Sequence, residues 1–123
     1  MVELRLDPPA GEYRIRSYQP GAISINHDTY SESLIISANS LITKWKPKTI
    51  NELTSNDWQP ILDQEPAIVI IGTGPQIVFP EIEHLTPLIE RNIGYEIMDT
   101  ASACRTYTVL VAEDRRVVAV LFP

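Results

Sequence analysis

The chain has 123 residues, which is enough for one domain spanning residues 1–123 and too few for two. Hydrophobic residues make up 44% of the sequence and charged residues 21%, so an intrinsically disordered chain is excluded. The net charge of −6 at pH 7 and the single cysteine argue against a nucleic-acid-binding protein and against a disulfide-stabilised scaffold.

The sequence contains no candidate membrane segment. The longest wholly apolar run, residues 67–71, is far shorter than the ~20 residues that span a bilayer, so we expect no membrane insertion. Residues 1–7 lack the apolar core of a signal peptide. A lone cysteine fits a reducing compartment. No Arg- and Ser-rich targeting sequence is recognisable at the start of the chain, and we therefore expect a cytoplasmic protein.

The first third of the chain alternates apolar and polar residues, which is the period of half-buried β-strands. In the second predicted strand, for example, Ile23 and Ile25 fall on one face. Polar turns at 19–21, 27–29 and 38–40 separate predicted strands at 13–17, 22–26, 33–36 and 41–45. Short strands with polar turns between them predict a small meander or a set of paired hairpins.

From Thr49 onward the apolar spacing changes, and helices alternate with strands. The predicted helices cover 55–63, 82–89 and 101–112, and the predicted strands cover 67–71, 95–98 and 117–122. Thr54 is the expected N-cap of the first helix, whereas Pro60 and Pro87 should shorten or distort the first two. Residues 67–71 are apolar on both faces, as in a central parallel strand. This order predicts an α/β fold with helices on a mixed, mostly parallel sheet.

The best candidate for a ligand site is the loop formed by Gly72, Thr73 and Gly74, which follows the predicted central strand. Open α/β sheets bind ligands at the carboxyl ends of their strands, and glycines let backbone N–H groups approach an anion closely. The dinucleotide-binding fingerprint is incomplete, because its third glycine is replaced by Ile77. The same residues also suit a tight turn at the end of a strand.

A second candidate is the start of the last predicted helix, where Thr100, Ser102 and Arg105 could contact an anion. Asp99 or Thr100 would serve equally well as a cap that occupies the free N–H groups. If the strands before the two loops are parallel neighbours, both loops lie at one edge of the sheet and could meet. The predicted ligand-binding residues are therefore Gly72, Thr73, Gly74, Thr100, Ser102 and Arg105.

Cys104 and Ser102 are the candidate nucleophiles of an enzyme. Cys104 lies beyond the first helical turn, where the helix dipole has little effect, and neither His27 nor His84 is placed as its base. A buried free cysteine is the alternative interpretation. One cysteine and two histidines at unrelated spacings predict no metal site, and the sequence predicts no cofactor.

Charge is distributed unevenly along the chain. Residues 49–100 contain nine acidic residues and one basic residue, Arg91, and form either a solvated surface or a docking face for a basic partner. Lys44, Lys46 and Lys48 alternate, so on an extended strand they would share one face. Such a face either guards a sheet edge or contacts an anion or an acidic protein.

Several segments carry a family resemblance through their order and spacing. They are residues 18–26, the strand and loop at 67–74 with Phe79-Pro80, and residues 94–100, 103–110 and 113–117. Together they resemble a small uncharacterised domain family that includes the mitochondrial complex I assembly factor and the adipogenesis-associated Mth938-domain protein. The resemblance implies a three-layer α/β fold, with a central mixed sheet and an added amino-terminal β-hairpin layer. It implies no established enzymatic activity.

Three functional hypotheses follow. The first is a non-catalytic protein-binding domain like an assembly factor, linked to the biogenesis of a respiratory complex, because the resemblance is to proteins that act by binding others. The second is a small-anion or small-molecule binding domain that uses the two loops. The third is an enzyme with Cys104 or Ser102 as the nucleophile. We expect a protein partner, no nucleic acid, and a monomer or homodimer.

Overall fold

The computed structural model of the chain describes residues 12–123. The absence of a signal peptide, which we expect from residues 1–7, concerns residues outside this range. The strands are β1 (Ile15–Gln19), β2 (Ala22–Ile25), β3 (Asp28–Tyr30), β4 (Leu34–Ser37), β5 (Leu41–Ile42), β6 (Ile68–Gly72), β7 (Gly94–Met98) and β8 (Val117–Leu121). The α-helices are α1 (Gln59–Leu62), α2 (Thr86–Glu90) and α3 (Thr100–Ala112), and the 3-10 helices are η1 (Ile50–Glu52), η2 (Ser55–Trp58) and η3 (Ile82–Leu85).

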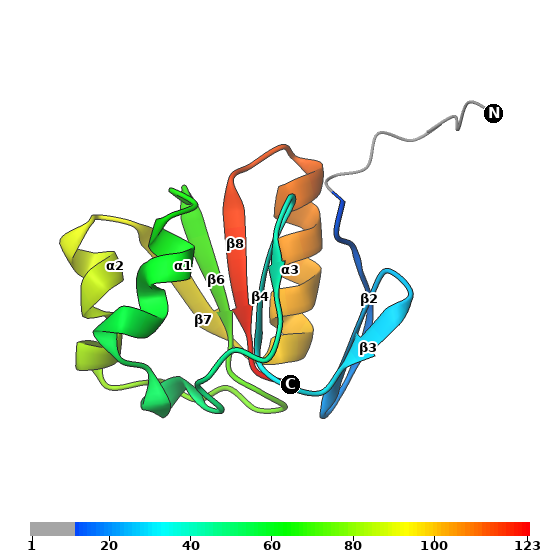
Figure 1. Ribbon diagram of the computed structural model, residues 1–123, viewed down its shortest axis with the longest axis horizontal. Helices are drawn as coiled ribbons and strands as arrows, with labels where there is room; N and C mark the ends of the chain where they lie inside the picture. Colours follow the sequence, from blue (N-terminus) through cyan, green and yellow to red (C-terminus); the bar gives the residue numbers. More distant parts are fainter. Residues whose placement is uncertain (1–11) are drawn as a thin grey trace.

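A five-stranded sheet with the order β5-β4-β8-β6-β7 forms the middle of the molecule. β6 runs parallel to both β7 and β8, whereas β4 runs antiparallel to β8 and β5. Figure 1 shows α1 and α2 on one side of this sheet and α3 on the other. The predicted mixed sheet, the central parallel strand and the alternation of helices with strands are therefore confirmed.

The amino-terminal strands form a separate antiparallel sheet with the order β1-β2-β3. This sheet packs on the outer side of α3, so α3 lies between two sheets (Figure 1). The predicted polar break at 27–29 is wrong in part, because β3 begins at Asp28. Asn26 turns the chain with a φ of 54°, which makes the turn shorter than the run of polar residues indicates.

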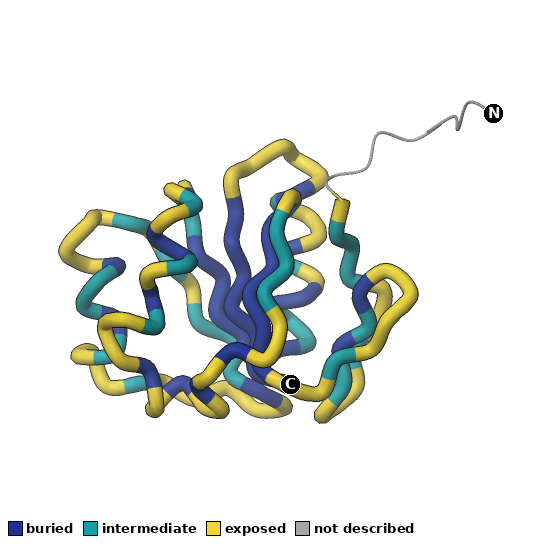
Figure 2. The backbone as a smooth tube through the Cα atoms, in the orientation of Figure 1, coloured by how far each residue is buried: buried dark blue, intermediate teal, exposed yellow. Residues whose placement is uncertain are grey.

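Alternate residues of the central strands build two cores, one on each face of the sheet. Figure 2 shows these strands buried along most of their length. In β8, Val118 and Val120 face α1 and α2, while Ala119 and Leu121 face α3. This explains why the central strands are apolar throughout: both faces are covered by helices. Within residues 12–123, no helix is long and apolar enough to span a bilayer.

The two helices that contain proline are short, as their sequences predict. Residues 55–62 form η2 followed by α1, and residues 82–90 form η3 followed by α2. Pro60 and Pro87 lie in the first turns of α1 and α2. Backbone N–H groups in a first turn have no partner within the helix, so proline costs no hydrogen bond there. Thr54 is the N-cap of η2, as predicted for this helical region. The Asp57 carboxylate accepts the backbone N–H of Thr54 at 2.9 Å.

The predicted strand over 41–45 is mostly wrong. β5 ends at Ile42, and Lys44 has a φ of 54°, which turns the chain away from the sheet. Lys44, Lys46 and Lys48 therefore do not guard a strand edge. Burial still alternates along this stretch: Trp45 and Pro47 are buried, and the three lysines are exposed.

Gly72, the last residue of β6, permits a close contact between the sheet and α3. A Cβ atom at this position would lie 2.8 Å from the Cβ of Ala103 and 3.0 Å from Leu121 Cδ2. It would also lie 3.0 Å from the Cα of Thr100. The absent side chain thus sets the distance at which the first turn of α3 packs on the strand.

Replacing Gly72 by alanine should lower the free energy of unfolding by about 1–3 kcal/mol, because the added methyl group overpacks this contact. Gly94→Ala is the matched control: Gly94 also lies in the central sheet, and the nearest atom to its added Cβ is the Ala67 carbonyl oxygen at 3.9 Å. Urea denaturation of both variants measures the difference. An equal loss of stability in the two would show that close packing is not the role of Gly72.

Candidate functional site

The two predicted loops meet at the carboxyl edge of the central sheet. The backbone N–H of Gly74 donates to Thr100 Oγ1 at 2.7 Å. The backbone N–H of Thr100 in turn donates to the Gly74 carbonyl oxygen at 2.8 Å. This contact follows from the parallel pairing of β6 with β7, which brings the ends of both strands to one edge.

The Thr100 side chain is the centre of this junction. It is fully buried, and its hydroxyl donates to the Phe122 carbonyl oxygen at 2.6 Å while it accepts from Gly74. One hydroxyl therefore joins the ends of β6 and β8 to the start of α3. Each buried backbone group that lost this partner would cost about 1–3 kcal/mol.

The remaining polar groups of the loop are also paired within the protein. The backbone N–H of Thr73 donates to the Met98 carbonyl oxygen at 2.9 Å. The Thr73 hydroxyl accepts from the backbone N–H of Val78 at 2.8 Å and lies 3.1 Å from the Gln76 carbonyl oxygen. The N–H groups of Thr73 and Gly74 thus hold the loop in place, and neither points to a free anion-binding position.

The start of α3 is capped in the same way. The Asp99 carboxylate accepts the Ser102 backbone N–H at 2.9 Å and the Ser102 hydroxyl at 2.8 Å. These hydrogen bonds, aided by the charge of Arg105, hold the pKa of Asp99 below its usual range. Arg105 donates to Ser102 Oγ at 3.2 Å. The predicted cap is therefore confirmed, and a carboxylate occupies the helix N-terminus.

The structure divides the predicted ligand-binding residues between two pockets. Thr73 and Gly74 line a pocket of about 630 Å³ at the carboxyl edge of the sheet. Arg105 lines another, of about 450 Å³, between β1 and α3. Gly72 and Thr100 are buried in the junction. A joint role of all six residues in ligand binding stays a prediction.

Cys104 faces the pocket between β1 and α3 but is only 6% exposed. Burial raises the pKa of its thiol to about 11. The positive charge of Arg105 acts in the opposite direction but is the smaller effect. The same pocket is lined by Tyr18, whose buried hydroxyl has no hydrogen-bond partner within residues 12–123. At neutral pH the thiol is protonated and is a weak nucleophile.

The histidines lie apart from each other and from Cys104. His84 Nδ1 lies 2.9 Å from the Leu53 carbonyl oxygen, and the His84 carbonyl oxygen accepts the Trp58 indole N–H at 2.7 Å. His27 is exposed in the turn before β3. Among residues 12–123, no three His, Cys, Asp or Glu side chains are grouped so that they could hold a metal ion.

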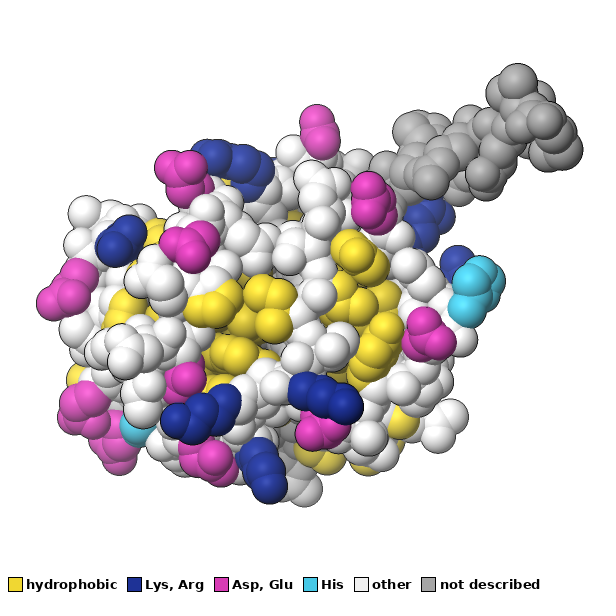
Figure 3. Space-filling model, viewed as in Figure 1, with side chains coloured by type: hydrophobic (Ala, Val, Ile, Leu, Met, Phe, Trp, Pro, Cys, Tyr) yellow, Lys and Arg dark blue, Asp and Glu magenta, His cyan; other side chains and the backbone are white. Residues whose placement is uncertain are grey.

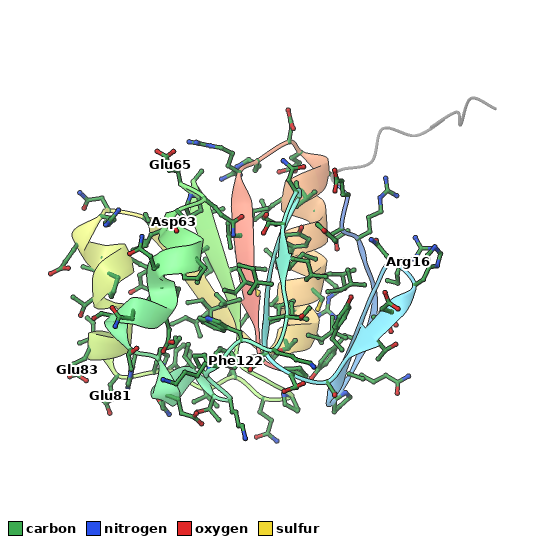
Figure 4. All side chains as sticks on the ribbon, viewed as in Figure 1. Arg16, Asp63, Glu65, Glu81, Glu83 and Phe122 are labelled. Atoms are coloured by element: carbon green, nitrogen blue, oxygen red, sulfur yellow. The ribbon has the colours of Figure 1, made fainter. Side chains whose placement is uncertain are left out.

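The structure also exposes an apolar segment to which the sequence assigned no role. We call the four exposed apolar residues of the stretch 77–82 the apolar segment: Ile77 is 45% exposed, Val78 41%, Phe79 73% and Ile82 65%. It follows the junction directly and begins after Pro75. The sequence signal for its first three residues was a short apolar run between Pro75 and Pro80. Ile82 belongs to the predicted helix over 82–89. Figure 4 shows Glu81 and Glu83 close together below α2, at the same corner of the molecule.

Comparisons with known proteins place the chain in a family. Residues 15–122 match the family described as "Protein of unknown function (DUF498/DUF598)", and the chain belongs to it. The chain is 28% identical over 107 residues to the 13 kDa major membrane protein of Francisella tularensis. This alignment covers 86% of the chain and 87% of that protein. It is also 28% identical over 111 residues to NADH dehydrogenase (ubiquinone) 1 alpha subcomplex assembly factor 3 of Danio rerio.

That alignment covers 89% of this chain but only 63% of the assembly factor, so the chain spans less than two thirds of that relative. A solution structure of a Mth938-like domain from Bordetella pertussis is similar with a TM-score of 0.79 and 24% identity, covering 99% of this chain and 92% of that one. The match at this identity shows a shared fold. The family resemblance and the fold that it implies are therefore confirmed.

The pKa of Cys104 predicts how the thiol reacts with iodoacetamide. The native protein should react slowly at pH 7, where about one thiol in ten thousand is ionised, and its rate should keep rising until about pH 11. In urea, where the chain is unfolded, the rate should stop rising above about pH 9, because the ordinary pKa of a cysteine thiol is 9.0. Because the unfolded thiol releases its proton first, the free energy of unfolding should decrease between these two pH values. Rapid labelling of the native protein at pH 7 would restore Cys104 as a candidate nucleophile.

Proposed function

We propose that the chain is a non-catalytic protein-binding domain that acts like an assembly factor. The observation that carries the proposal is the apolar segment, above all Phe79, whose side chain is 73% exposed. Large exposed apolar side chains that are contiguous in the chain are typical of interaction sites, and aromatic residues are frequent anchors of such sites. Some relatives are named as assembly factors of NADH dehydrogenase, which extends the proposal to the biogenesis of a respiratory complex.

The apolar segment is presented by an ordered support, which favours a role in binding. The backbone N–H of Val78 is held by the Thr73 hydroxyl. At the other end, the side chain and the carbonyl group of His84 bond to Leu53 and Trp58. A partner that docks here does not have to order a free loop, and less binding free energy is lost to conformational entropy.

Charge around the apolar segment indicates what the partner carries. Glu81 and Glu83 are exposed beside Phe79 and Ile82, and neither forms an ion pair within the described part of the chain. The stretch 49–100, in which they lie, has nine acidic residues and one basic residue. We therefore infer a partner with an apolar contact surface bordered by Lys or Arg. Opposite charges of this kind mainly raise the rate of association and make it depend on salt.

The proposed setting is the cytoplasm, because the single free cysteine fits a reducing compartment. In this setting the partner is another protein chain, and the domain by itself is a monomer or homodimer. The pockets are not required for this function, since docking uses the surface side chains of the apolar segment.

A photo-crosslinking residue placed at Phe79 should capture the partner in living cells, whereas the same residue at Val109 should not. Val109 is a matched position, because it is 55% exposed and lies on α3, away from the apolar segment. The double variant Phe79→Ser/Ile82→Ser should abolish the complex and change the free energy of unfolding by no more than about 0.5 kcal/mol. Mass spectrometry of the crosslinked products identifies the partner.

Two results would contradict the proposal. One is equal crosslinking at positions 79 and 109, which would indicate nonspecific contact. The other is a complex that survives the double serine variant with unchanged affinity.

The double variant Glu81→Gln/Glu83→Gln should weaken the complex mainly at low salt, because it removes the acidic border of the apolar segment.

A further inference from the structure

The larger of the two pockets at the candidate site carries an inference that is independent of the apolar segment. It has a volume of about 630 Å³, which is within the range of roughly 300–1,000 Å³ typical of small-molecule sites. Its walls come from the loop after β5, the segment before β4 and the ends of β6 and β8. The residues that the argument uses are Lys44, Trp45, Lys46, Lys48, Glu32 and Phe122.

All the lysines of the chain lie in this one wall. Lys44, Lys46 and Lys48 are the only lysines among 123 residues, and each of them lines the pocket. None of their ammonium groups forms a hydrogen bond or an ion pair within residues 12–123. The only acidic side chain that lines the pocket is Glu32. Figure 3 shows basic side chains along the lower edge of the molecule, which is the carboxyl edge of the central sheet, with acidic side chains beside them.

The fold holds this wall in position. The backbone N–H of Trp45 donates to the Ser33 carbonyl oxygen at 3.0 Å, and the Ser33 hydroxyl donates to the Pro47 carbonyl oxygen. The Trp45 ring packs against Phe122, with ring centroids 5.8 Å apart. Because the residues between the lysines are anchored, the three like charges stay on one side of the chain despite their mutual repulsion. An anion bound in the pocket would therefore be close to all three positive charges.

We propose that this pocket binds a phosphorylated small molecule with at least two negative charges. The ammonium groups of the three lysines bind the phosphate oxygens, and the edges of Trp45 and Phe122 provide an apolar wall for the remainder of the ligand. The backbone N–H groups of Thr73 and Gly74 line the pocket but are already paired, so the ligand is recognised by lysine side chains and not by a glycine loop. A concave site fits a small molecule better than a flat membrane surface.

Titration of the full chain with inorganic pyrophosphate, followed by ¹H–¹⁵N NMR at a physiological ionic strength of ~0.15 M, tests this proposal. We expect saturable shifts of the amide signals of residues 44–46, 48–49 and 73–74; Pro47 and Pro75 carry no N–H group. Lys46→Gln/Lys48→Gln should weaken binding at least about tenfold, because charge-assisted hydrogen bonds to phosphate are lost. The matched control is Arg115→Gln/Arg116→Gln, which removes two exposed positive charges at the other end of β8 and should leave the affinity unchanged.

Each other outcome overturns the proposal. Equal weakening by the lysine and arginine pairs would show a general effect of net charge. An absence of saturable shifts at millimolar pyrophosphate would show that the pocket is not a phosphate site. Binding to phosphatidylglycerol vesicles without a response to pyrophosphate would assign the lysines to a membrane surface. The amide spectrum of each variant shows whether it is folded, so a folding defect is not mistaken for lost binding.

Discussion

The structure depends on one buried contact, in which the Thr100 hydroxyl joins the Gly74 N–H group to the Phe122 carbonyl oxygen. The missing side chain of Gly72 lets α3 approach closely enough for this contact to form. The ends of β6 and β8 and the start of α3 are thereby held together. The apolar segment and the lysine-lined pocket both begin at this junction, so its geometry sets where each of them lies.

The junction also leaves the backbone N–H groups of Thr73 and Gly74 paired within the protein, so side chains beside the loop are the better candidates for recognising another molecule. Many α/β proteins bind ligands through free backbone N–H groups at the carboxyl edge of the sheet. Here Gly74 donates to Thr100, and the Asp99 carboxylate caps α3. Among residues 12–123, the exposed apolar segment and the lysines without an ion pair lie beside the loop and can recognise another molecule. The first suits a protein partner, and the second suits an anion.

Much of this arrangement could be predicted from the sequence, because local patterns determine it. The period of apolar residues indicated the central parallel strand, and Asp99 indicated the cap. The two loops were expected to meet only if their strands were parallel neighbours, a pairing that the structure supplies. The alternation also indicated that the three lysines share one face. Their place in a pocket beyond β5 could not be predicted, since a positive φ at Lys44 turns the chain away from the strand where the alternation continues. The exposure of Phe79 also could not be predicted, because an apolar run carries no sign of whether the fold covers it.

Native-state hydrogen exchange of the Gly74 amide tests most directly whether the junction is a fixed structural element. If it is, this N–H exchanges only when the whole domain unfolds, at the same free energy as the slowest amides of β6 and β8. The amide of Phe79, in the exposed apolar segment, should exchange through a much smaller local opening. Exchange of Gly74 as fast as that of Phe79 would contradict the account, because the loop would then be open and its donors free for a ligand.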